Sequence, residues 1–69
     1  MKFNKLKGAR AEKGYSQKDM ADKIGISTDS YHLKENGKTE FKLSEVKKIL
    51  DILDKEFTDI FLDWITLRV

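Results

Sequence analysis

The sequence predicts an all-helical fold of five short helices. Apolar residues recur at intervals of three and four along most of the chain, which is the spacing of a helix face packed on a core. Serines stand where helices are expected to begin, and glycines stand where they are expected to end. A chain of 69 residues has room for one small domain, so we expect residues 1–69 to form a single unit.

The first helix is predicted over residues 4–13. Phe3, Leu6 and Ala9 are spaced to line its inner face. Gly14 ends the helix, because glycine takes the left-handed conformation that closes a helix at no steric cost.

Residues 17–37 predict two more helices joined by a tight turn. Ser16 caps the first of them by accepting a backbone hydrogen bond, and Gly25 ends it. Ser27 then caps the second, which extends to about Asn36. Two short helices joined by a glycine turn are typical of a helix-turn-helix.

A fourth helix is predicted over residues 43–53, with apolar residues at core spacing (Val46, Ile49, Leu50 and Leu53). Phe41, in the loop before it, is expected to turn inward. Asp54 follows the helix, and we expect it to be left-handed because aspartate tolerates that conformation better than most residues. Residues 57–61 predict a short fifth helix.

In this order the motifs resemble the phage repressor and Cro-type helix-turn-helix family, which includes 434 repressor-like proteins. The resemblance covers residues 6–61 and rests on Ser16-Gln17, Ala21, Gly25-Ile26-Ser27, Tyr31 and Glu35-Asn36-Gly37-Lys38. It implies a compact, lambda-repressor-like DNA-binding domain with its helix-turn-helix at residues 17–36. The segment SYHLKENGKTEF is closer to phage and prophage proteins of Gram-positive bacteria.

One departure from the family concerns Lys34, which stands where most members have an aliphatic residue. We expect its stem to cover the core while its ammonium reaches solvent. The resemblance also implies an ion pair between Arg10 and Glu35 that ties the first helix to the third.

The resemblance further implies contacts with double-stranded DNA. Gln17 begins a helix, where free N–H groups and the helix dipole favour a phosphate. The full set of expected phosphate contacts is Arg10, Gln17, Ser27, Asn36, Lys38, Thr39 and Lys42. The expected base contacts are Thr28, Asp29, His32 and Leu33.

The chemistry of these four side chains suggests what each one reads. Asp29 can only accept, so it selects cytosine N4, and it also repels nearby phosphates. Thr28 and Leu33 fit a thymine methyl group. For His32 two readings stay open: it donates to guanine, or it points to solvent.

Charge is unevenly distributed. Residues 1–13 hold five Lys or Arg against one Glu, whereas residues 49–69 hold five Asp or Glu against two Lys or Arg. Basic segments that flank the helix-turn-helix suit a face that meets a polyanion. An ordinary solvated surface is the alternative reading of the same pattern.

The C-terminal tail, residues 62–69, alternates apolar and polar side chains as a strand does. A lone strand is unstable and must pair with something. We expect a homodimer interface made by Phe61, Trp64, Ile65, Leu67 and Val69. The alternative is that the tail folds back over the core of its own chain.

The composition argues against other classes of protein. The chain has no Cys and a single His, so no metal site and no cofactor are expected. It lacks an apolar run of membrane-spanning length and a signal peptide, which favours a cytoplasmic protein. No nucleophile, base and orienting group stand at supporting spacing, so we expect neither an enzyme nor a small-molecule substrate.

These observations predict a sequence-specific transcriptional regulator that occupies its operator through the major groove, as a repressor or a Cro-like protein. The alternative is a protein-interaction module with the same fold, such as an antitoxin or an adaptor.

Overall fold

The computed structural model describes residues 3–61, and this part of the chain is all helical, with no strand. Its helices are α1 (Asn4–Glu12), α2 (Gln17–Ile24), α3 (Thr28–Glu35) and α4 (Leu43–Leu53), and residues 57–61 form a fifth helical turn. The helices begin and end within a residue or two of the predicted positions. The all-helical fold predicted from the sequence is confirmed.

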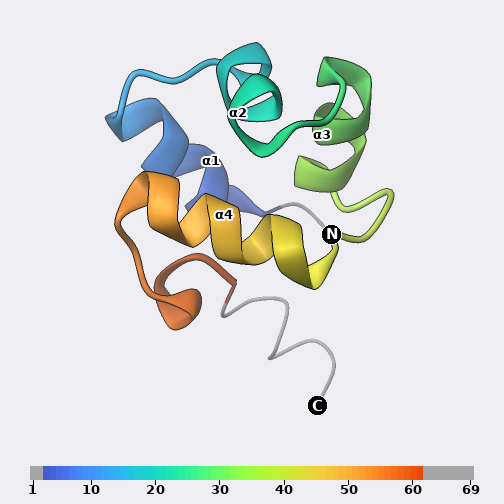
Figure 1. Cartoon of the computed structure of the whole chain (residues 1–69). Helices are drawn as coiled ribbons and strands as arrows, with labels where there is room; N and C mark the ends of the chain where they lie inside the picture. The colour runs from blue at the N-terminus through green and yellow to red at the C-terminus, as the bar shows by residue number, and fades with distance from the viewer. Residues whose placement is uncertain (1–2, 62–69) are drawn as a thin grey trace.

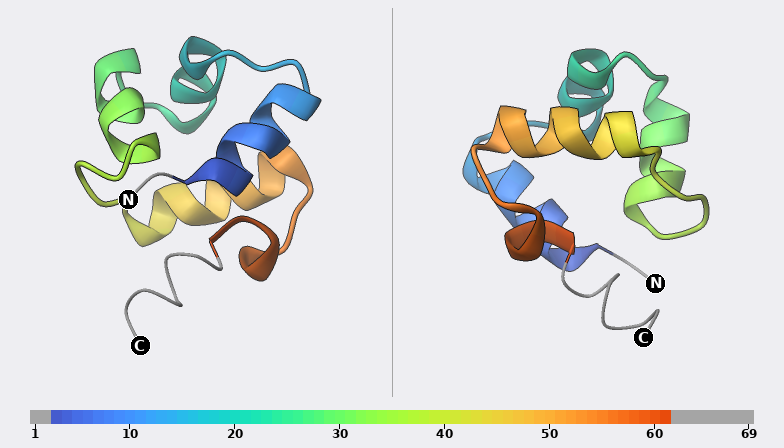
Figure 2. Two further views of the ribbon diagram at one scale, coloured as in Figure 1. Left: turned by 180° about the vertical axis from the view of Figure 1, so that it is seen from behind. Right: turned by 60° about the horizontal axis from the view of Figure 1, so that its bottom comes forward.

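The helices are arranged around α1 and α4, which lie across the middle of the molecule (Figure 1). The pair α2 and α3 covers one end, and the turn at residues 57–61 lies at the opposite end (Figure 2). This arrangement leaves one side of α3 without a neighbouring helix.

The core is built from apolar residues of every helix. Leu6 of α1, Met20 of α2, Tyr31 of α3 and Ile49 of α4 are all completely buried. Leu6 and Ile49 lie on the faces that the sequence periodicity assigns to the interior.

An aromatic cluster of Phe3, Phe41 and Phe61 closes the core near both ends of the described chain. The ring centroids of Phe3 and Phe61 lie 5.4 Å apart, and those of Phe3 and Phe41 lie 5.6 Å apart, both edge-on. Phe41 also meets the ring of Tyr31 at 6.0 Å, which joins the cluster to α3. Edge-on contacts of this kind stabilise beyond simple area burial.

Phe61 is completely buried in this cluster. It was expected at a homodimer interface, but in the structure it serves the core of its own chain. The other tail residues of that prediction, Trp64, Ile65, Leu67 and Val69, lie outside the described residues.

The local signals at helix ends act as predicted. Ser16 Oγ accepts from the Asp19 backbone N–H at 3.0 Å, and Asp19 Oδ2 accepts from the Ser16 N–H at 2.9 Å, which completes a capping box. Gly25 is left-handed, with φ of 81°. Asp54 is left-handed as well, with φ of 54°.

The expectation for Lys34 is wrong. Its Nζ lies 2.6 Å from Oε1 of Glu45 in α4, and only 12% of its side chain is exposed. The same Glu45 oxygen accepts the backbone N–H of Lys42 at 2.8 Å, at the start of α4. The ammonium therefore joins α3 to α4 instead of reaching solvent.

The carboxyl of Glu45 is held in its charged form. Burial alone would raise its pKa, but the hydrogen bonds from Lys34 and from the Lys42 backbone outweigh burial, and the pKa is lowered. The ionised form of Glu45 is the one that pairs with the Lys34 ammonium.

Candidate nucleic-acid interface

The α3 helix has one buried face and one open face. Tyr31 and Glu35 are buried, with 0% and 2% of their surface exposed. The open face carries Thr28, Asp29, His32 and Leu33, all of them at least partly exposed. The four predicted base-contacting residues therefore lie together on the exposed side of α3.

The packing of α2 against α3 holds this face in place. Ala21 is completely buried, and its small side chain allows α3 to pass close by. Its carbonyl accepts the backbone N–H groups of Gly25 and Ile26, at 2.9 and 3.0 Å, which closes the turn between the helices. The result is the geometry of a helix-turn-helix, in which the second helix is presented outward.

A single carboxylate joins α1, α2 and α3. Glu35 Oε2 accepts from Arg10 Nε at 2.9 Å and from the Tyr31 hydroxyl at 2.7 Å. Its Oε1 accepts from Arg10 Nη2 and from Gln17 Nε2, each at 3.1 Å. The predicted ion pair is therefore present, and it is bidentate.

Burial and hydrogen bonding act in opposite directions on Glu35. Burial alone would raise the pKa of its carboxyl, but the hydrogen bonds from Arg10, Tyr31 and Gln17 outweigh it, and the pKa is lowered. The Glu35 hydrogen bond raises the pKa of the Arg10 guanidinium, while burial raises the pKa of the Tyr31 hydroxyl well above its usual range. Glu35 is therefore an anion, and Tyr31 is a neutral donor.

The side chain of Arg10 is occupied by protein contacts. Besides its two bonds to Glu35, its Nη1 donates to the Tyr15 carbonyl at 2.8 Å. Arg10 was expected both in this pair and at a phosphate. The structure places its guanidinium in the first of these roles.

Both ends of the Gln17 amide are also held. Nε2 donates to Glu35, and Oε1 lies 3.1 Å from Nδ1 of His32. Gln17 can still offer a phosphate its backbone N–H, which has no acceptor within the helix because Gln17 is the first residue of α2.

The remaining predicted phosphate contacts lie around the two ends of α3. At its start, Ser27 Oγ accepts from the Ser30 N–H at 3.1 Å, which leaves the Ser27 hydroxyl hydrogen to donate elsewhere. At its end, Asn36 caps the helix, and Lys38, Thr39 and Lys42 are exposed in the loop that follows. These groups surround the open face of α3 with donors and positive charge.

Sequence reasoning missed two contacts in this region. The Tyr31 hydroxyl binds Glu35 one turn along α3, and this pair has the four-residue spacing of helical neighbours. That spacing is a signal in the sequence that could have found the pair. The contact between Gln17 and His32 spans 15 residues and two helices, and it has no local signal.

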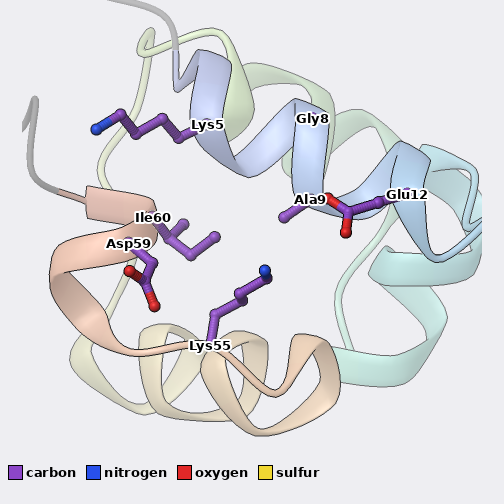
Figure 3. A pocket seen from close by; sticks show the side chains of 7 residues that line it. All are labelled: Lys5, Gly8, Ala9, Glu12, Lys55, Asp59 and Ile60. Carbon is purple, nitrogen blue, oxygen red and sulfur yellow. The ribbon is translucent and has the colours of Figure 1, made fainter.

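A pocket of about 390 Å³ lies on another part of the surface, between α1 and residues 55–60 (Figure 3). Its lining combines two lysines, two carboxylates and three small or apolar residues (Lys5, Lys55, Glu12, Asp59, Gly8, Ala9 and Ile60). Because its charges are of both signs, it has no preference for a polyanion.

The described part of the chain holds neither a metal-binding cluster nor a membrane-spanning helix. Within residues 3–61, no three His, Asp or Glu side chains are grouped so that they could hold a metal ion. None of the helices that the structure describes is long and apolar enough to cross a membrane.

Comparison with known proteins agrees with this geometry. The helix-turn-helix family model HTH_3 matches residues 6–60. A relative in Bacillus subtilis strain 168, the SPbeta prophage-derived uncharacterized HTH-type transcriptional regulator YonR, is 45% identical over 49 residues.

That match covers 71% of this chain and 45% of the relative, so the chain spans less than half of the relative's length. No solved structure matches with significance. The family match covers most of the chain and the whole of the helix-turn-helix. The chain therefore belongs to the Cro and repressor-type helix-turn-helix family.

Proposed function

We propose that this chain is a sequence-specific DNA-binding transcriptional regulator of the phage or prophage type, with α3 as its recognition helix. The observation that carries the proposal is the open face of α3, on which Thr28, Asp29, His32 and Leu33 lie together. In helix-turn-helix proteins such a face lies in the major groove. The B. subtilis relative, which is named as a transcriptional regulator, supports the same function.

The residues around α3 fix the protein on the DNA backbone. Lys38 and Lys42 attract phosphates, the Ser27 and Thr39 hydroxyls and the Asn36 amide donate to them, and Gln17 donates through its backbone N–H (Arg10 acts indirectly, by holding Glu35). Contacts of this type give affinity and orientation, whereas the four residues on the open face give sequence preference.

The binding unit is a homodimer that uses the apolar tail. Trp64, Ile65, Leu67 and Val69 form an apolar segment of the kind that marks interfaces. Two copies place their recognition helices about 34 Å apart, one turn of DNA, on an inverted repeat. Occupation of such a site blocks polymerase, which is repression without any chemical reaction. Its DNA target places the protein in the cytoplasm of a bacterial cell, at the nucleoid.

In vitro selection of the purified chain on random duplex DNA, at near-physiological salt, tests this function. We expect an inverted repeat with half-sites centred about 10 base pairs apart. Enrichment of a single half-site would support DNA recognition and contradict the homodimer. If no sequence is enriched and binding simply disappears as salt rises, the chain has only nonspecific attraction to phosphates, and the proposed function fails.

Variants separate the two kinds of contact. Thr28→Ala and Asp29→Ala should change the selected sequence, whereas Lys38→Ala should weaken binding to all sequences alike. Lys55→Ala is the matched control, because Lys55 lines the pocket between α1 and residues 55–60, away from α3. An unchanged selected site in both open-face variants would mean that α3 does not read bases.

A further inference from the structure

We infer that neutral His32 reads its base pair as a hydrogen-bond acceptor, because Gln17 holds the imidazole in the form that carries its proton on Nδ1. The base class that fits is then one with an amino group in the major groove, adenine or cytosine. This inference rests on the proposed function and names the specificity of one residue in it.

The first step concerns the orientation of the Gln17 amide. One end of the amide lies 3.1 Å from Glu35 Oε1. An ionised carboxylate only accepts hydrogen bonds, and this one already has Arg10 and Tyr31 as donors. The end of Gln17 that faces it must be the NH₂ group. The carbonyl oxygen of Gln17 is therefore the end that faces His32.

The second step concerns the imidazole. Nδ1 of His32 lies 3.1 Å from Gln17 Oε1, which has no hydrogen to give. The bond forms only when Nδ1 carries the proton. A neutral imidazole has one N–H proton, so the other nitrogen, Nε2, is then unprotonated. The hydrogen bond made by one ring nitrogen therefore determines the state of the other.

Asn36 also lies beside the ring, but it does not select between the two nitrogens. Its Nδ2 donates to the His32 carbonyl at 2.8 Å, and since that carbonyl only accepts, the amide orientation of Asn36 is fixed as well. The same Nδ2 lies 3.3 Å from each ring nitrogen, so it is not directed at either one alone. A donor equally near both nitrogens favours neither ring form, so the assignment rests on the carbonyl oxygen of Gln17.

The consequence for base reading follows from the groove edges of the bases. Adenine N6 and cytosine N4 are donors in the major groove, whereas guanine O6 and N7 are acceptors. An acceptor at Nε2 can bind the amino groups of adenine and cytosine, whereas it is repelled by O6 and N7 of guanine. His32 therefore rejects guanine, in contrast to the donation to guanine that the residue type alone suggests.

The assignment can be tested without DNA. His32 is the single histidine of the chain, so long-range ¹H–¹⁵N correlations of the imidazole need no assignment. At a pH where the ring is neutral, we expect Nδ1 to resonate as the protonated nitrogen and Nε2 as the unprotonated one. Protonation of Nε2 in the wild-type chain would overturn the inference outright.

Two variants test the cause. Gln17→Met keeps the length of the side chain and removes its carbonyl, and it should shift the ring toward Nε2–H, with circular dichroism as the check that the variant is folded. Asn36→Ala is the matched control and should leave the Nδ1–H form in place. A shift in Asn36→Ala with none in folded Gln17→Met would overturn the role of Gln17.

Binding to DNA tests the consequence. The base pair that His32 faces is the one whose preference disappears in His32→Ala. On the strand that His32 contacts at this pair, we expect wild-type protein to favour adenine or cytosine over guanine by about fivefold, the lower end for a specific base contact. A preference for guanine on the contacted strand, or no pair affected by His32→Ala, would overturn the inference while DNA recognition stands. Absence of all sequence preference in the wild-type chain would instead be the failure of the proposed function.

Discussion

Arg10 and Glu35 are 25 residues apart in the sequence and form a bidentate pair, with Nε to Oε2 at 2.9 Å and Nη2 to Oε1 at 3.1 Å. Because Glu35 also binds Tyr31 and Gln17, this one carboxylate sets the position of α3 relative to α1 and α2. The stability of the domain and the orientation of its proposed reading face therefore depend on the same group.

Glu35→Gln should lower the free energy of unfolding by about 3–5 kcal/mol, because it leaves the Arg10 charge in a largely buried place without its partner. Urea denaturation followed by circular dichroism measures the change. Lys18→Ala is the control, since it breaks an exposed pair with Asp22 in which the side chains are 73% and 64% exposed. Exposed pairs of this kind contribute little, so no measurable change is expected there. Equal effects of the two substitutions would contradict the structural role of Glu35.

Stability should fall in acid. The pKa of Glu35 is lowered in the folded chain from an ordinary value of 4.5. The unfolded chain therefore takes up a proton first as pH falls, and folded-state stability declines between that ordinary value and the lowered one. Glu45 acts in the same direction. Above the ordinary pKa the carboxylates contribute their full stabilisation to the folded chain. Urea midpoints should therefore be constant toward neutral pH and decline below about pH 5.

Glu35→Gln serves as the control for the acid effect. The variant has no carboxyl to titrate at this position, so its urea midpoint should depend less on pH than that of the wild-type chain. An unchanged pH dependence in the variant would assign the acid sensitivity to other carboxylates.

Asp54→Gly should stabilise the fold. Asp54 closes α4 with φ of 54°, a conformation that costs an L-residue energy and costs glycine none. Part of the gain is offset because glycine is freer in the unfolded chain, so we expect an increase of up to about 1 kcal/mol in the free energy of unfolding. Asp54→Ala should destabilise, since alanine lacks the tolerance of aspartate for this region. The urea midpoint should be highest for the glycine variant, lower for the wild-type chain and lowest for the alanine variant. A higher midpoint for the alanine variant than for the wild-type chain would contradict the prediction.

Lys38→Ala should reduce the salt dependence of DNA binding. If Lys38 neutralises one phosphate per protomer, its removal makes the negative slope of log K against log salt less steep, by about 0.9 for each phosphate that is no longer neutralised. Titrations of an operator duplex at several salt concentrations measure the slope. The control, Lys55→Ala, removes an equal charge from the pocket surface and should leave the slope unchanged. A change in both slopes would indicate that net charge, and not a phosphate contact, is responsible.

The sequence predicts the helices well because their ends depend on nearby residues. The capping serines, the glycine after α2 and the left-handed Asp54 act over three or four positions, so the sequence alone carries these signals. The residues of the open face of α3 were instead predicted through the resemblance to the repressor family.

Contacts between helices were predicted less well. Lys34 has the length to reach solvent or a partner, and only the position of Glu45 across the following loop decides between them. Phe61 is apolar enough for a dimer interface or for a core, and its neighbours Phe3 and Phe41 come from distant parts of the chain. Such choices depend on tertiary packing, which local patterns do not contain.

The contact between Phe3 and Phe61 has a consequence for the connectivity of the chain. The two rings stand 5.4 Å apart, so the first and the last described residue lie beside each other in the core. Domains with this property tolerate circular permutation. A short glycine-rich linker from Phe61 to Phe3, with new ends opened at the exposed Lys13–Gly14 connection, should give a permuted protein with the same helix packing. The fold would then not require α1 to α4 to follow one another in their natural order.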